Sequence, residues 1–350
     1  MTLVVDTDTG IDDALALLWL AGRREVELVA VFATHGNCAT GQAAANARRV
    51  LDIAGRWDVP VTPGRSGPLV GPPRPSRHVH GRDGLGDCGV APPPWPAPRP
   101  GHDAVAGLLR LAEIHAGELD LLVLGPLTTL AATLVVDPHL PGALRSLTIM
   151  GGVGVRGGPG VPPARLPTDA NTAHDPDAAR RVHATTGAGE GRGPSVTLIG
   201  LDVTLAATAG PRHLARLAAA GTSHGRFAAT IVRPYLDEIE ARRGTRRLTM
   251  HDPIAAMVGV GADVGATFVD GDATVEGAPG NERTVVHETR ARDASGVTAP
   301  ATAPTDGRAD GPRRSSPSTG GRTRALVGID ADAVAEELID ALTRPLPFPA

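Results

Sequence analysis

Residues 1–20 read MTLVVDTDTGIDDALALLWL, in which a short apolar run is followed directly by four aspartates and then by a second apolar stretch. Residues 2–5 (TLVV) have the pattern of a buried strand, and residues 14–21 (ALALLWLA) begin a helical pattern. A strand, an acidic turn and a helix form the first part of a βαβ unit. The turn needs an explanation of its own, because crowded carboxylates raise one another's pKa unless a cation or hydrogen bonds compensate their charge.

The same alternation of strand and helix continues along the chain. Apolar strand patterns that end in turn residues recur in VELVAVFATHGN, DLLVLGPLTT, SLTIMGG, SVTLIGLDVT and TRALVGID, with helical patterns between most of them. This order predicts an α/β fold, an open and mostly parallel (Rossmann-like) sheet with helices on both faces. Ligands of such sheets bind beyond the carboxyl ends of the strands. The active site is therefore expected at that edge, where the acidic turn and the other strand ends meet.

Two segments interrupt this order. Residues 67–100 form a Pro/Gly-rich loop with histidines at its centre, long enough to suggest a functional loop. Residues 291–322 contain almost no large apolar side chain and are expected to be a disordered Pro/Gly/Ser-rich insertion. A strand and a helix pattern follow in residues 323–346, so the insertion interrupts a domain instead of ending one. Residues 1–350 are predicted to form a single domain.

Composition restricts the partners and the compartment. The net charge of −4 and the pI near 6.3 show no basic excess, so a small molecule is a better candidate partner than nucleic acid or a membrane. The sequence contains no lysine, which excludes a Schiff-base or P-loop lysine. Cys38 and Cys88 cannot build a disulfide framework, no secretory signal pattern is present, and no apolar run is long enough to span a bilayer. A cytoplasmic location is therefore expected.

The aspartates of the acidic turn allow three interpretations. In the first, Asp6 and Asp8 cap the helix that follows, since carboxylates favour helix N-termini. In the second, LVVDTDT matches the haloacid-dehalogenase phosphatases, in which Asp6 is the nucleophile, although their usual downstream lysine is missing. In the third, Asp8 and Asp13 ligate a divalent cation while Asp12 faces the substrate. A calcium-binding EF-hand is excluded, because Leu17 stands where its last glutamate is required.

Further short motifs follow the acidic turn along the chain. They are HGN at 35–37, HGRDGLG at 80–86, GPLT at 125–128, MGG at 150–152, Asn171 before DPDAA at 175–179, LDVT at 201–204 and HDP at 251–253. Together with DTDTGIDD at 6–13, this series resembles the inosine-uridine-preferring nucleoside hydrolase family. The resemblance extends over roughly residues 1–285, and the last helix matches again beyond residue 322.

The resemblance implies a calcium-dependent hydrolase that cleaves the N-glycosidic bond of ribonucleosides to ribose and free nucleobase. By motif position, the metal ligands would be Asp8, Asp13, Asp252 and the backbone carbonyl of Leu124. The substrate-binding residues would be Asp12, Asn37, His80, Asp169 and Asn171. The resemblance also implies a homodimer or a homotetramer. A non-catalytic ribonucleoside-binding protein is the alternative outside the enzyme classes.

These residue types suit the chemistry. Breaking a glycosidic bond passes through an oxocarbenium-like state, which carboxylates around the sugar stabilise. Calcium acidifies bound water only weakly, so Asp8 is predicted to accept the proton of the attacking water. A nucleobase leaves poorly as an anion, and His251 is predicted to protonate it, with His80 as its partner or competitor.

Overall fold

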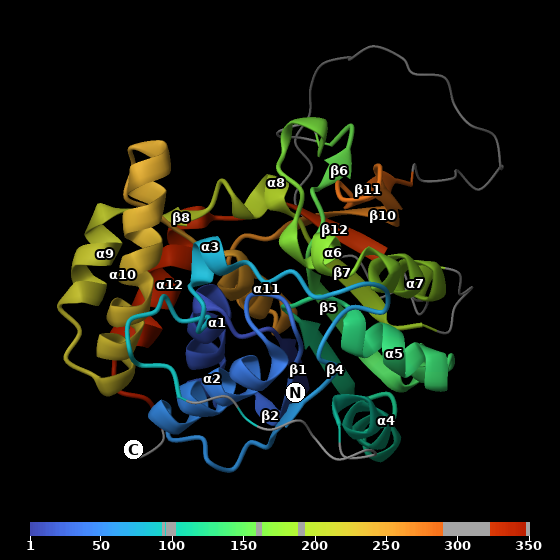
Figure 1. Cartoon of the computed structure of the whole chain (residues 1–350), viewed down its shortest axis with the longest axis horizontal. Coiled ribbons are helices and arrows are strands. Elements are labelled where there is room, and N and C mark those ends of the chain that lie inside the picture. Colours follow the sequence, from blue (N-terminus) through green and yellow to red (C-terminus); the bar gives the residue numbers. More distant parts are fainter. Residues whose placement is uncertain (93–94, 96–102, 159–162, 188–192, 290–322, 348–350) are drawn as a thin grey trace, which may run out of the picture.

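The structure is a computed structural model, and it describes residues 1–92, 95, 103–158, 163–187, 193–289 and 323–347. The insertion expected at 291–322 lies outside the described residues. Within them, a ten-stranded sheet crosses the molecule (Figure 1). In spatial order its strands are β3 (Val61–Pro63), β2 (Glu27–Ala33), β1 (Thr2–Thr7), β4 (Leu119–Val123), β5 (Leu144–Met150), β7 (Ser195–Ile199), β12 (Thr323–Gly328), β10 (Thr267–Glu276), β11 (Arg283–Glu288) and β6 (Val155–Arg156).

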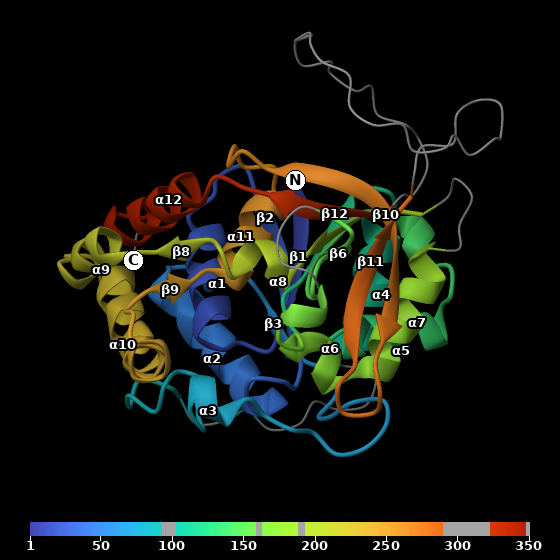
Figure 2. The same ribbon diagram turned by 90° about the horizontal axis from the view of Figure 1, so that it is seen from above.

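The strands from β3 to β12 in this order all run parallel. Strand order reverses between β1 and β4, as in Rossmann-like sheets, so the predicted α/β fold is confirmed. Beyond β12 the sheet continues through the antiparallel strands β10 and β11. Figure 2 shows this hairpin lying beside the helix α7 (Pro176–Gly187). The alternation read from the sequence did not indicate the hairpin.

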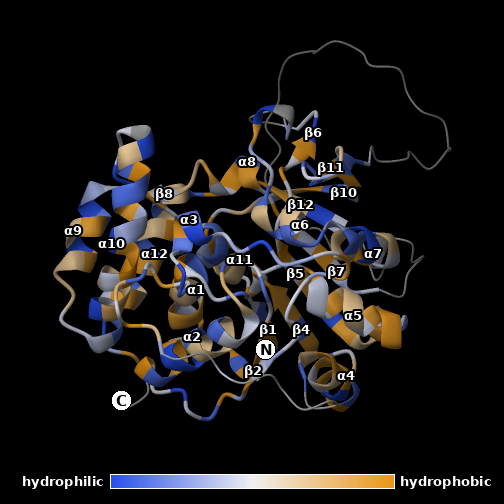
Figure 3. Ribbon diagram, in the orientation of Figure 1, coloured by the Kyte–Doolittle hydropathy of each residue, from blue (hydrophilic) through white to orange (hydrophobic). Residues whose placement is uncertain are grey.

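Helices cover both faces of the sheet. One face carries α1 (Ile11–Ala21), α2 (Thr40–Ile53), α10 (Ser223–Arg243), α11 (His251–Gly259) and α12 (Ala331–Thr343), and the other carries α4 (Ala104–Ile114), α5 (Thr128–Val136) and α7. Successive side chains of β1 therefore point to opposite faces of the sheet. Leu3 and Val5 pack into the first layer, and Val4 packs into the second. In Figure 3 the hydrophobic colour lies mainly on the strands and on helix sides that face them.

Shorter elements complete the described part of the fold. They are α3 (Arg77–His80), α6 (Ala170–His174), α8 (Leu201–Thr204), α9 (Pro211–Ala218), the 3₁₀ turns Leu140–Ala143 and Pro163–Arg165, and the two-stranded sheet of β8 (Thr208–Ala209) and β9 (Leu248–Thr249). Among the residues that the structure describes, no helix is long and apolar enough to span a membrane.

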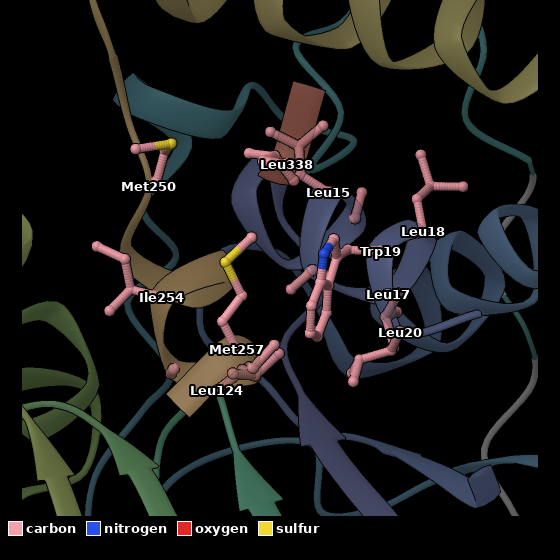
Figure 4. Close-up of a cluster of buried hydrophobic side chains, with 14 of the residues drawn as sticks. Leu15, Leu17, Leu18, Trp19, Leu20, Leu124, Met250, Ile254, Met257 and Leu338 are labelled. Carbon is pink, nitrogen blue, oxygen red and sulfur yellow. The ribbon is translucent and has the colours of Figure 1, made fainter. Parts of the chain in front are cut away.

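Helix α1 lies in the middle of the first core layer. All of its residues except Asp12 are buried, because its sequence is apolar around the whole circumference. Figure 4 shows Trp19 of α1 next to Met257 of α11, and the indole nitrogen of Trp19 donates a hydrogen bond to Glu337 of α12. The close packing fixes the position of the helix N-terminus, where the acidic turn ends.

The structure places the four aspartates differently from the single acidic turn expected from the sequence. Strand β1 continues to Thr7, so Asp6 belongs to the strand, and α1 begins at Ile11, so Asp12 and Asp13 occupy its first turn. Only Asp8 among the four lies in the connection itself. The four carboxylates therefore start from three different backbone environments.

Candidate active site

A cavity of about 770 Å³ opens at the carboxyl end of the parallel strands, where the strand order reverses. Its wall includes Met150, the last residue of β5, and residues from the segments that follow β1, β2, β4 and β7: Asp12, Asn37, Leu124 and Leu201. The prediction that these strand ends share one edge is therefore confirmed. A cavity of this volume at this position is typical of small-molecule sites.

Most of the residues proposed from the sequence line this cavity. They are Asp12, Asn37, His80, Leu124, Asp169, Asn171, His251 and Asp252. The remaining two, Asp8 and Asp13, are fully buried and lie behind the lining residue Asn37, which is hydrogen-bonded to both. The tertiary structure thus brings all ten proposed residues to one place.

Asn37 joins the two buried carboxylates. Its backbone N–H donates to Asp8 Oδ2 at 2.7 Å, and its side-chain Nδ2 donates to Asp8 Oδ1 and to Asp13 Oδ2, both at 3.0 Å. Asp13 also accepts hydrogen bonds from the Thr7 hydroxyl and from the Gly10 backbone N–H. These bonds hold both carboxylates in one orientation before any ligand binds.

The glycine of the HGN motif is required by this arrangement. Gly36 has φ +151°, and a Cβ atom at this position would lie 1.9 Å from Asp8 Oδ2. Thr9, on the other side of Asp8, has φ +25°, a value that β-branched residues rarely adopt. The backbone on both sides of Asp8 therefore adopts conformations that few side chains tolerate, as is common at functional sites.

Negative charge is concentrated in this corner of the cavity. Asp12, Asp13 and Asp252 each place a carboxylate oxygen within 4.8 Å of the others. Burial and then the charge of Asp13 raise the pKa of Asp8 well above its usual range, and the same two causes raise the pKa of Asp12 to about 7. Burial and then the charges of Asp12 and Asp13 raise the pKa of Asp252. A bound cation would compensate this charge and favour the ionised form of these carboxylates.

The donor set fits a hard divalent cation. Carboxylate and carbonyl oxygens are the ligands that calcium and magnesium prefer in proteins. The cluster in the structure differs in one member from the set implied by the resemblance, because Asp12 and not Asp8 groups with Asp13 and Asp252. Asp8 remains adjacent through Asn37, and its charge raises the pKa of Asp252 as well.

Asp169 and Asn171 lie at the N-terminus of α6 and also line the cavity. Asp169 caps that helix, since its Oδ1 accepts the backbone N–H of Thr172 at 2.8 Å, and burial raises the pKa of its carboxyl group. Asn171 Nδ2 donates to the carbonyl oxygens of Leu124 at 2.6 Å and Met150 at 3.0 Å. Because a carbonyl oxygen has two lone pairs, the Leu124 carbonyl keeps the capacity for a second partner.

The two candidate histidines are held differently. His80 Nδ1 accepts the backbone N–H of Ile11 at 3.1 Å, and burial lowers the pKa of its ring to about 4. This neutral ring is a poor proton donor at neutral pH, so His80 suits substrate binding better than acid catalysis. His251 begins α11 and has its Nδ1 2.7 Å from the hydroxyl oxygen of Thr204. His251 also lines the cavity, and its role as the acid stays a prediction.

Two parts of the wall are not among the ten site residues proposed from the sequence. Helix α10 contributes Tyr235, Ile239 and Arg242, spaced so that they share one helix face, and the turn between β10 and β11 contributes Gly280 and Glu282. The helical spacing of the three α10 residues could have been recognised in the sequence. The turn between β10 and β11 carries no such sequence signal, because its place in the site depends on the pairing of β10 with β12.

The loop that begins at residue 67 reaches the site as the sequence suggested. Pro68, Val70 and Ser76 line the cavity. The loop is attached at two points, since Leu69 N–H donates to Asp175 Oδ2 at 2.8 Å and Ser76 Oγ lies 3.0 Å from His174 Nε2.

Comparisons with known proteins agree with this geometry. The sequence profile of the inosine-uridine preferring nucleoside hydrolases matches residues 3–335. Uridine nucleosidase 1 of Arabidopsis thaliana is 32% identical over 275 residues, which are 78% of each chain. The inosine-uridine preferring nucleoside hydrolase of Leishmania major is 32% identical over 254 residues, 72% of this chain and 76% of that one.

Solved structures extend the similarity to nearly the whole fold. A plant nucleoside hydrolase superposes with a TM-score of 0.77 at 25% identity, covering 98% of this chain and 99% of its own. A purine-preferring ribonucleoside hydrolase from Gardnerella vaginalis gives a TM-score of 0.77 at 26% identity, covering 98% of both chains. The chain therefore belongs to the inosine-uridine preferring nucleoside hydrolase family and is a hydrolase that acts on N-glycosyl compounds.

Proposed function

We propose that this protein hydrolyses the N-glycosidic bond of ribonucleosides with calcium bound at the acidic turn, releasing ribose and free nucleobase. The observation that carries the proposal is the approach of Asp12, Asp13 and Asp252 to within 4.8 Å of one another in a wall of the 770 Å³ cavity. Asp8, Asp13, Asp252 and the Leu124 carbonyl are the proposed ligands. Calcium is favoured over magnesium because it accepts many oxygen ligands in loose geometry. When bound, calcium would supply positive charge to the ribose hydroxyls and to a water molecule.

The chain's own residues divide the remaining tasks. Asp12, Asn37, His80, Asp169 and Asn171 line the cavity and are proposed to bind the substrate, chiefly through the ribose hydroxyls. Asp8 is proposed as the base, because each of its oxygens keeps a lone pair beyond the bond it accepts from Asn37. The buried carboxylates around the sugar would stabilise the oxocarbenium-like state electrostatically. His251 would protonate the leaving base.

The decisive experiment is a substrate panel with metal control. The calcium-loaded protein is incubated with inosine, uridine, cytidine and adenosine, and reducing sugar is measured. Release from at least one nucleoside is expected, with loss of activity in excess EGTA and recovery when calcium is added back. A folded, calcium-loaded sample that cleaves none of the four would overturn the proposed substrate class. Full activity in EGTA would overturn the metal dependence and leave the substrate class standing.

An assembly of two or four copies is also proposed. The resemblance implies a homodimer or a homotetramer, and three apolar side chains near the ends of α4 and α5 are largely exposed: Ile114 (59%), Val135 (58%) and Val136 (64%). Helices α4 and α5 contact each other, and a second copy of the chain would cover apolar side chains exposed near their ends. Light scattering of the full chain measures the mass, and a monomer at micromolar concentration would contradict the proposal.

Asp6→Asn is expected to leave nucleoside hydrolysis within about threefold of the wild-type rate. Asp6 does not line the cavity; its Oδ1 accepts the Thr129 hydroxyl at 3.3 Å, and burial raises its pKa to about 8. The carboxyl group is therefore mostly protonated at pH 7, and a neutral amide of the same size replaces it at small cost. Steady-state kinetics and a thermal melt test the variant. A complete loss of nucleoside hydrolysis in the folded variant would contradict this prediction and would place Asp6 in the catalytic machinery.

A further inference from the structure

The LDVT motif at 201–204 has no role in the function proposed above, yet its last residue contacts the proposed acid. Thr204 ends the short helix α8, which follows β7 at the carboxyl end of the sheet. Its hydroxyl oxygen lies 2.7 Å from Nδ1 of His251. Thr204 is 0% exposed, whereas His251 lines the cavity. The hydroxyl therefore approaches the imidazole from the protein side.

The backbone holds the two residues together. The chain after α8 forms β8, and the chain before α11 forms β9, and these strands pair antiparallel with Thr208 opposite Thr249. The pairing lies four residues after Thr204 and two residues before His251. A ladder so close to both residues restricts their relative motion. The contact is thus built into the fold and does not depend on the conformation of an exposed side chain.

We propose that Thr204 is a positioning residue for protonation of the leaving base: its hydroxyl oxygen accepts the Nδ1–H of His251, so that Nε2 is the atom that delivers the proton. The inference rests on the role given to His251 under "Proposed function". An imidazole can transfer a proton from either nitrogen, and the hydrogen bond at one nitrogen decides which proton stays. The Thr204 bond retains the proton on Nδ1 and fixes the plane of the ring.

The proton balance follows from this assignment. As the bond between C1′ and the base nitrogen breaks, its electron pair goes to the base, and the proton on His251 Nε2 moves to the base. Water forms the new bond to C1′ and gives its proton to Asp8. His251 is then neutral with hydrogen on Nδ1, and the bond to Thr204 is intact throughout. Exchange with solvent returns a proton to Nε2 and removes one from Asp8.

Two variants at one position separate positioning from packing. Thr204→Val keeps the volume and removes the hydroxyl, and Thr204→Ser keeps the hydroxyl and removes a methyl group. A positioning role predicts that Thr204→Val lowers kcat by about ten- to hundredfold, a part of the 10²–10⁴-fold that general acids contribute, while Thr204→Ser stays within about threefold. A packing role predicts the reverse order, because the buried methyl contacts would then matter more than the hydroxyl.

The leaving group supplies the second comparison. p-Nitrophenyl β-D-ribofuranoside releases a phenolate that is stable as an anion, so its hydrolysis needs no proton from His251. Thr204→Val is expected to lose at most about twofold on this substrate, and His251→Ala serves as the reference for complete loss of the acid. Equal losses on the nucleoside and on the nitrophenyl riboside would show that Thr204 supports the whole site, and would overturn the proposal.

A measurement on the wild-type protein covers the case in which Thr204→Val does not fold. Long-range ¹H–¹⁵N spectra of histidine-labelled protein report which ring nitrogen carries hydrogen, and the His251→Asn variant identifies the signal. Hydrogen on Nδ1 of His251 is expected, and a neutral ring with hydrogen only on Nε2 would overturn the proposal. Failure of the wild-type protein on every nucleoside would instead reject the proposed function, so the two failures are distinguishable.

Discussion

Asp252→Asn is expected to lower nucleoside hydrolysis by at least about 10³-fold and to weaken calcium binding by more than about 100-fold. The substitution keeps the size of the side chain and removes one of the three carboxylates that lie within 4.8 Å of one another. Loss of a residue that only supports a metal ligand costs about 10–100-fold in metal affinity, so loss of a ligand itself is expected to cost more. The effect would reach the first turn of the chain from a residue about 240 positions away.

Thermal melts give this prediction a readout that does not depend on activity. In the wild-type protein, calcium at about 100 times its Kd stabilises the fold by about 2.7 kcal/mol, a rise in Tm of roughly 4 °C. Asp252→Asn should show little of this rise. Without calcium the variant should melt no lower than the wild type, because the crowded carboxylates repel one another and one charge has been removed.

The matched control is Asp263→Asn, which removes an exposed carboxylate shortly after α11. It should retain both the calcium-dependent rise in Tm and the activity. If Asp252→Asn kept the calcium response, Asp252 would not be a ligand, and the cluster would need another explanation.

Asp8→Ala is expected to reduce kcat by about 10³–10⁴-fold, the upper range for loss of a general base. Asp8 holds two hydrogen bonds from Asn37, at 2.7 and 3.0 Å, that orient its carboxylate. Removal of the carboxylate takes away the proposed proton acceptor and leaves the buried Asn37 N–H without its partner. Some loss of stability, about 1–3 kcal/mol, is therefore expected together with the loss of catalysis.

Asp6→Asn is the control for Asp8→Ala, because Asp6 is two residues away, buried to the same degree and absent from the cavity wall. Single-turnover kinetics above the substrate Kd separate catalysis from binding and from the fraction of folded protein. A rate for Asp8→Ala above about a tenth of the wild-type rate would show that another group accepts the proton.

Much of the fold was predictable because local patterns report burial directly. The apolar run before Asp6 is a strand buried on both faces, and the alternating segments after it can pack only as helices on a parallel sheet. Strand ends of a parallel sheet meet at one edge, which is why Asn37, Leu124 and Met150 could be expected to line one cavity. The antiparallel strand β10 was not predictable in this way, since its partner β12 follows only after residues 290–322.

The sequence by itself determined the α/β fold and the edge that carries the site, because these depend on short-range patterns. The ten proposed site residues came from the order of motifs that resembles a known family. Only the tertiary structure decided which carboxylates share a cluster, that Asn37 joins Asp8 to Asp13, and that Thr204 contacts His251. The physical reason is distance along the chain. The residues in these contacts are 24 to 240 positions apart in the sequence, so the contacts depend on how helices and strands pack. No local pattern specifies how closely two such side chains approach each other.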